Sequence, residues 1–249
     1  MKRWLILAIM LAVCTPSFAQ FDNFAWDVKA DSSKTSPNSI SGSNLVKPVN
    51  IGDIENGNYF QIDSQGRYKA IGDSAVAWDD LRVPVSNLKL NPVNEKPDFA
   101  PFSAGRAFLF DPDSAESTYF AVQIPHNYKL GTDLEAHIHW APIDVTGGAV
   151  QWGIRYSLAN IGADLAANPA ASDTASAVGS AIGTAFNHKL TDIATIDGSG
   201  INSVSSMIIA TVYRIAGATA DSYTNDAALL EIDFHYQIDS LGSRWEMTK

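Results

Sequence analysis

The chain has 249 residues, with 27 acidic and 17 basic side chains and a net charge of −10 at pH 7. This acidic balance argues against nucleic acid or an anionic membrane surface as the main partner, because both would repel it. A single cysteine excludes a framework of disulfides within the chain.

The first 19 residues are typical of a secretory signal peptide. Lys2-Arg3 forms a basic start, an apolar run follows, and residues 17–19 supply the small side chains that a signal peptidase requires. We expect cleavage after Ala19 and export of the mature chain. Cys14 is a weaker candidate for a lipid attachment site, because Val13 stands where such signals carry a small residue. No later apolar run is long enough for a membrane helix, so we expect no membrane span.

Between residues 20 and 104 the sequence predicts little regular structure. Residues 20–50 are rich in Ser, Asn, Asp and Lys without a helical or strand period, which indicates a flexible N-terminal arm. Two short β-like runs around Ser64-Gln65-Gly66 predict a hairpin. Because 78–102 contains four prolines, it is expected to lie over the core as a strap and not to form part of a central sheet. Residues 51–104 are therefore interpreted as hairpin and strap.

From residue 105 to 249 the pattern is a succession of strands separated by Gly, Pro, Asp and Asn clusters. Expected strands cover 106–110, 118–124, 134–143, 149–160, 182–193, 205–215 and 228–238. This succession predicts an all-β fold, a jelly-roll-like antiparallel β-sandwich. The alanine- and serine-rich segment 163–179 fits either a long loop or a short helix.

Alternation along these strands separates a core face from a polar face. In the last strand the apolar face comprises Leu230, Ile232, Phe234, Tyr236 and Ile238. The opposite face comprises Glu231, Asp233, His235 and Gln237. In 134–143, His137 and His139 likewise oppose an apolar set. Such polar faces indicate a solvated surface or a polar subunit interface.

His137 and His139 are the sharpest chemical feature. Two imidazoles at i and i+2 point the same way from a strand, which suits a divalent transition metal. We therefore take His137 and His139 as candidate ligands, with His126 and His235 as weaker companions. Three chains meeting on an axis could each contribute one His-x-His pair. The plainer alternative is that both imidazoles are exposed or hydrogen-bonded strand residues.

A cupin-type metalloenzyme is a further alternative. The glycine before His-x-His resembles the opening of the cupin metal motif, and cupins are jelly rolls. Asp144 would replace the glutamate of that motif, but the following glycine spacing differs and no second motif occurs. His188 and His235 are the distant candidates for the missing ligand.

Other catalytic patterns are missing from the sequence. It contains no Gly-x-Ser-x-Gly elbow, no phosphate-binding glycine loop and no His-Glu-x-x-His helix. We therefore expect a protein that is not an enzyme, and we assign no catalytic residue.

Three blocks resemble a phage-associated family of tail, head-fibre and other virion proteins. They are residues 72–84, the pattern PHxYxxGTDxxxHxHW at 125–140 and the pattern FHYxIDxxGSR at 234–244. The resemblance covers roughly residues 50 to 249. It implies a structural or attachment component of a virion surface or fibre, acting as a homo-oligomer, with a trimer favoured.

The export signal departs from this resemblance, because virion proteins are normally assembled in the cytoplasm. Two alternatives follow. One is a bacterial filament or matrix subunit whose arm adds a strand to a neighbour's sheet. The other is a secreted carbohydrate-binding module. All these interpretations place the protein outside the cell, on a cell surface or on a virion surface. An attachment protein would have a glycan or cell-surface receptor as its partner.

Overall fold

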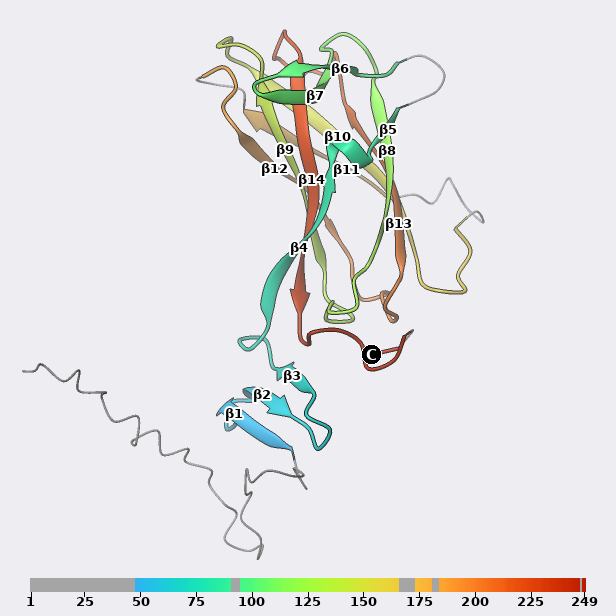
Figure 1. The fold of residues 1–249 in the computed structure, drawn as a ribbon. Helices are drawn as coiled ribbons and strands as arrows, with labels where there is room; N and C mark the ends of the chain where they lie inside the picture. The colour runs from blue at the N-terminus through green and yellow to red at the C-terminus, as the bar shows by residue number, and fades with distance from the viewer. Residues whose placement is uncertain (1–47, 91–94, 166–172, 181–183, 247) are drawn as a thin grey trace, which may run out of the picture.

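The computed structural model describes residues 48–90, 95–165, 173–180, 184–246 and 248–249, and these form mainly β-strands (Figure 1). The expected signal peptide at 1–19 and nearly all of the expected arm at 20–50 lie outside the described residues. In the part that is described, no helix has both the length and the apolar character needed to cross a membrane.

Two antiparallel sheets pack face to face, which confirms the predicted β-sandwich. The first has the order β12-β9-β14-β7-β6, and β4 also pairs with β14. Its strands are β4 (Ala77–Pro84), β6 (Asp98–Phe102), β7 (Gly105–Phe110), β9 (Leu134–Pro142), β12 (Lys189–Ile196) and β14 (Ala227–Ile238). The second has the order β11-β10-β13-β8-β5. Its strands are β5 (Lys89–Leu90), β8 (Ser117–Gln123), β10 (Ala149–Ala159), β11 (Asp173–Ser180) and β13 (Met207–Arg214). One turn of 3₁₀ helix, η2 (Val85–Asn87), joins β4 to β5.

The pairing of the strands from β7 to β14 follows one rule. Strand β7 lies beside β14, β8 beside β13, β9 beside β12 and β10 beside β11. The first half of this domain therefore runs beside the second half in reverse order. Strands that are neighbours in sequence mostly alternate between the two sheets, so most loops cross from one sheet to the other at an end of the sandwich (Figure 1).

The core lies between the sheets and is rich in aromatic side chains. Trp140 from β9 and Trp152 from β10 are fully buried and meet edge to face at 6.1 Å. Phe110 packs on Trp152, and Phe120 packs near Phe234 across the same layer. Burial of one such side chain stabilises the fold by about 1.5–3 kcal/mol. This core holds β9 and β14 rigidly at the centre of their sheet.

A β-bulge in β14 changes the expected division of its residues between the two faces. The pairing with β9 shifts between Leu229 and Glu231. Leu229 is fully buried in the core, whereas Leu230 lines a cleft on the outer face beside Glu231. The prediction that Leu230 belongs to the core face is therefore wrong. An extra residue at a bulge reverses the alternation on one side of it.

The expected strap also differs from the structure. Residues 77–84 form β4, which pairs with β14 over Glu231–Ile238. Two of the prolines are compatible with strand pairing because of where they lie. Pro84 is the last residue of β4, and Pro101 belongs to β6, the edge strand of the sheet. Proline is tolerated at strand ends and on edge strands, where its missing N–H is not needed.

The segment at 163–179, for which the sequence left a loop or a helix open, contains most of strand β11. This strand pairs with β10 at the edge of the second sheet. The strand expected from residue 182 begins only at Lys189. Small alanine and serine side chains give a weak alternation signal, which explains why β11 escaped prediction.

A small three-stranded sheet lies beyond one end of the sandwich (Figure 1). It comprises β1 (Val49–Asp53), β2 (Asn58–Ile62) and β3 (Tyr68–Ile71). The expected hairpin corresponds to β2 and β3. The backbone N–H of Ala70 donates a hydrogen bond of 2.6 Å to the carbonyl oxygen of Asp239, just after β14. Ala70 is the sole buried hydrophobic residue described in this sheet. The sheet therefore has almost no core of its own.

Candidate metal centre

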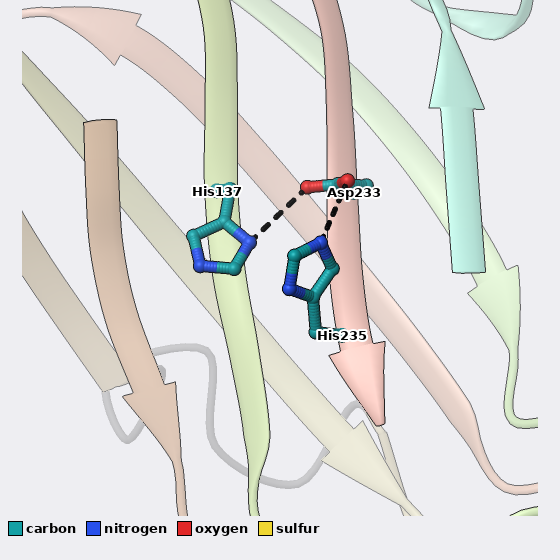
Figure 2. A group of neighbouring side chains, drawn as sticks. All are labelled: His137, Asp233 and His235. Atoms are coloured by element: carbon teal, nitrogen blue, oxygen red, sulfur yellow. Dashed lines mark ion pairs between the residues drawn. The ribbon is translucent and has the colours of Figure 1, made fainter. Parts of the chain in front are cut away.

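Strands β9 and β14 bring histidines and carboxylates together on the outer face of the first sheet. His137 on β9 lies opposite Asp233 on β14, and His235 follows two residues after Asp233 on the same face. Their neighbours Ile138 and Phe234 point into the core. Figure 2 shows both imidazoles turned toward the Asp233 carboxylate.

The three side chains have the geometry of a metal ligand set. The His137 Nδ1 atom lies 3.4 Å from Asp233 Oδ1, and His235 Nε2 lies 3.3 Å from Asp233 Oδ2. One ligand atom from each residue lies within 4.8 Å of the others. Two ligands about 2.1 Å from a metal, at the tetrahedral angle, are about 3.4 Å apart. The pair formed by His137 and Asp233 therefore has the spacing of two ligands around one ion.

Burial makes the arrangement chemically unusual. His137 is 7% exposed and Asp233 is 4% exposed, although both lie on the outer face of the sheet. Within the described part of the chain, His137 Nδ1 and Asp233 Oδ1 are buried and have no hydrogen-bond partner. Such an atom costs about 1–3 kcal/mol when it stays unsatisfied. A cation between these two atoms would satisfy both.

Other carboxylates lie around this group. The His137 Nε2 atom is 3.2 Å from Asp192 Oδ1 on β12. A carboxylate in that position fixes the tautomer and leaves Nδ1 free as a ligand. On the other side, Asp80 Oδ1 from β4 lies 3.2 Å from His235 Nε2. Asp80 is thus placed to add an oxygen ligand near His235.

His139, the second residue of the His-x-His pattern, plays a different part. Its Nε2 atom lies 3.2 Å from Asp233 Oδ2, and its Nδ1 atom lies 2.8 Å from His188 Nε2. The rings of His139 and His188 stack with centroids 5.0 Å apart. When His139 donates from Nε2, it holds the Asp233 carboxylate in place while His188 donates to Nδ1. The arrangement suits an outer partner that orients a metal ligand.

A surface cleft of about 380 Å³ opens beside the carboxylate. It is lined by Asp80, Arg82, His139, His188 and Glu231, among others. Arg82 donates to both Glu231 oxygens, at 2.5 and 2.6 Å, and this contact helps to raise the pKa of Arg82 further. The guanidinium is thus directed to Glu231 and leaves the Asp233 carboxylate to the histidines.

The structure places the remaining candidate ligands away from this group. His126 hydrogen-bonds Ser243 Oγ at 2.6 Å and Ser205 Oγ at 2.9 Å. Asp144, the residue that a cupin motif would use, binds Asn225 and the Tyr223 hydroxyl instead. A hydrogen bond from the Thr146 backbone is the largest cause of the lowered pKa of Asp144.

Asp233 is the residue that sequence reasoning did not select as a ligand. Its position two residues before His235 on one strand face was visible in the sequence. The missing fact was the pairing of β14 with β9, which joins residues 96 positions apart, such as His137 and Asp233. That pairing depends on the packing of the whole sandwich.

Comparison with known proteins adds no relative. No protein-family model matches the chain, and the search of curated proteins found no match.

Proposed function

We propose that this chain is an exported structural or attachment protein, not an enzyme, that holds one divalent transition metal at His137, Asp233 and His235. The observation that carries the metal assignment is the pair of buried, unsatisfied atoms, His137 Nδ1 and Asp233 Oδ1, facing each other at 3.4 Å. Imidazole nitrogen with carboxylate oxygen is a ligand set that suits zinc, iron, nickel or copper.

A metal here would have a structural consequence. It would link β9 to β14, the two central strands of the first sheet, through side chains on the solvent side. Because a metal bound by the folded state alone stabilises that state, the sandwich would resist unfolding better when loaded. A surface component that works outside the cell benefits from such a link, since this chain offers no disulfide framework.

His137 is buried, and its partners belong to the same chain. Both facts support a site that is completed by one subunit. A site on a three-fold axis needs imidazoles that point away from their own chain. His137 instead has Asp192 on one side and Asp233 on the other. We therefore favour one metal per chain over one metal shared by three chains.

The metal assignment is tested by isothermal titration of the metal-free, full-length protein with Zn²⁺. We expect one site per chain, and a loss of affinity of at least about 100-fold in His137→Ala. His126→Ala is the matched control, because His126 binds two serine hydroxyls elsewhere. Equal affinity in wild type and His137→Ala would overturn the assignment.

A metal-dependent enzyme is the second candidate, and one observation favours it. Three protein ligands leave coordination positions open, as in catalytic zinc sites, and the 380 Å³ cleft borders Asp233. The two functions differ in turnover. Hydrolysis of p-nitrophenyl acetate that requires Zn²⁺ and disappears in Asp233→Asn would favour the enzyme. A hydrolysis rate that changes neither on addition of Zn²⁺ nor in Asp233→Asn would support the structural role.

A further inference from the structure

A second cleft lies between the small sheet and the segment after β14. It has a volume of about 600 Å³. One wall comes from β2, β3 and the turn between them, and the other comes from residues 240–244 with Lys249. The backbone hydrogen bond from Ala70 to Asp239 holds the two walls together.

The charge of this cleft is opposite to that of the whole chain. Its lining contains four basic side chains, Arg67, Lys69, Arg244 and Lys249, against one acid, Asp63. The chain as a whole carries a net charge of −10. A local excess of positive charge in an acidic protein attracts anions to this place and repels them elsewhere.

Two of the four cations are held by partners inside the protein. Arg67 donates from Nε to Asp63 Oδ2 at 2.6 Å, and its hydrogen bond lowers the pKa of Asp63 to about 2. The Lys249 ammonium contacts Asp239 and the Asn127 carbonyl oxygen. Lys69 lies at 4.0 Å from Asp239, the outer limit of an ion pair, with its side chain 58% exposed.

Besides Lys69, Arg244 remains available to a ligand. Among the described residues, no carboxylate lies within ion-pair distance of it. Its guanidinium instead lies over the ring of Trp245, 5.1 Å from the centroid. Stacking on an aromatic face orients a guanidinium while its N–H donors stay free for a bidentate anion such as a carboxylate or a sulfate.

The apolar surface around Arg244 indicates what carries the anion. Trp245, which follows Arg244 in the chain, is 62% exposed, and Leu241 in the cleft lining is 88% exposed. Tyr68 is the aromatic side chain of the lining itself. An aromatic side chain with one wet face packs against the C–H face of a sugar ring. The cleft volume lies in the range of small-ligand sites, about 300–1,000 Å³, which favours a short ligand over a long polyanion.

We propose that this cleft binds an acidic saccharide, with Arg244 and Lys69 on its carboxylate or sulfate and Tyr68 against a sugar ring, while Trp245 orients Arg244 from beside the cleft. This inference rests on the attachment role proposed above and names the class of ligand. It does not involve the metal centre, because none of the cleft residues belongs to the histidine cluster.

The test measures binding of four probes to the full-length protein by titration calorimetry. The probes are 3′-sialyllactose, a sulfated chondroitin disaccharide, neutral lactose and inorganic sulfate. We expect at least one acidic saccharide to bind at least about tenfold more tightly than both lactose and sulfate, with an affinity that falls as salt rises. Binding of 3′-sialyllactose would show that a carboxylate is sufficient, whereas binding of the chondroitin disaccharide alone would point to its sulfate, because both saccharides carry a carboxylate.

Arg244→Gln should weaken this binding about tenfold or more, because one charged hydrogen-bonding partner is lost. Arg106→Gln is the matched control, since Arg106 also lies over an aromatic ring, that of Phe99. Arg106 belongs to β7, which lies at the end of the sandwich far from the small sheet (Figure 1). The proposal would be overturned if lactose or sulfate bound as tightly as the acidic saccharides. It would also be overturned if no acidic saccharide bound at millimolar concentration, or if Arg244→Gln bound it as tightly as the wild type. Arg244→Gln should keep the wild-type affinity for Zn²⁺, because Arg244 lies outside the histidine cluster, so failure of the saccharide proposal is distinct from failure of the metal assignment.

Discussion

Asp233 lies among three imidazoles, and its carboxylate is almost completely buried on the outer face of a sheet. His137, His139 and His235 approach it at 3.4, 3.2 and 3.3 Å. A buried carboxylate requires a compensating charge or several hydrogen bonds, because desolvation of an ion is costly. A bound dication supplies that charge.

Replacing the carboxylates should separate a ligand from a residue that orients a ligand. Asp233→Asn should lower Zn²⁺ affinity by at least about 100-fold, since it removes a ligand charge. Asp192→Asn should lower it by about 10- to 100-fold, because Asp192 contacts only the far nitrogen of His137. Competition with a fluorescent zinc chelator measures both. A larger loss in Asp192→Asn than in Asp233→Asn would contradict these roles.

Asp63 offers a pH test in the second cleft. Arg67 holds the folded-state pKa of Asp63 at about 2, below its ordinary value of 3.8. Since this pKa is lowered on folding, the contact stabilises the small sheet above pH 4 and its contribution disappears as pH falls toward 2. Carboxyl chemical shifts in an NMR titration should show a midpoint near 2 in the wild type and a higher midpoint in Arg67→Gln, which loses the side-chain hydrogen bond. An ordinary midpoint in the wild type would show that the contact does not form.

At the scale of elements, β14 joins the core to the candidate centre. Phe234 is fully buried between Asp233 and His235 and fixes the direction of both side chains. Alternation in the sequence predicted this division of β14 correctly from Ile232 onward. It failed at Leu230, because a bulge changes the phase and bulges have no alternation signal.

The same limit explains why the sequence did not predict the candidate site as a whole. Alternation indicated that His137 and His139 share a face, and that His235 and Asp233 share another. Nothing in the pattern showed that these two faces are one surface, because the register of β9 against β14 is set by side-chain packing across the core. His139 and His137 therefore looked equivalent in sequence, although they contact different atoms of Asp233.

Phe234→Ala should destabilise the protein by about 3–5 kcal/mol, because it leaves a cavity in the core beneath the site. Metal affinity should fall with it, since both flanking ligands lose their support. Leu241→Ala, at an 88% exposed position, should change stability by less than about 0.5 kcal/mol. Urea denaturation of the metal-free variants measures both. Similar destabilisation by the two changes would contradict the described packing.

The whole molecule combines a well-packed sandwich with a small sheet that lacks a core. Ile51 and Phe60 in that sheet are 37% and 43% exposed. A sheet of three short strands gains little stability unless it covers apolar surface. We therefore expect the small sheet to pack against another copy of the chain, in line with the homo-oligomer, with a trimer favoured, expected from the sequence.

Phe60→Ser should shift the oligomer toward monomers without unfolding the sandwich, because Phe60 is 43% exposed on the small sheet, where its ring centroid lies 5.5 Å from that of Tyr68, and it is not part of the sandwich core. Ile209→Ser, at an exposed apolar position of the second sheet, is the matched control. Light scattering after size-exclusion chromatography reports the mass. If the wild type is a monomer at micromolar concentration, the small sheet is not an assembly surface.

The central claim is that one chain holds one transition metal between β9 and β14. Native mass spectrometry of the purified full-length protein after incubation with Zn²⁺ tests it most directly, because it counts subunits and ions together. We predict an assembly that carries one ion per chain, and the same assembly without ions for Asp233→Asn. A wild-type assembly free of metal, or one ion shared among three chains, would contradict the account.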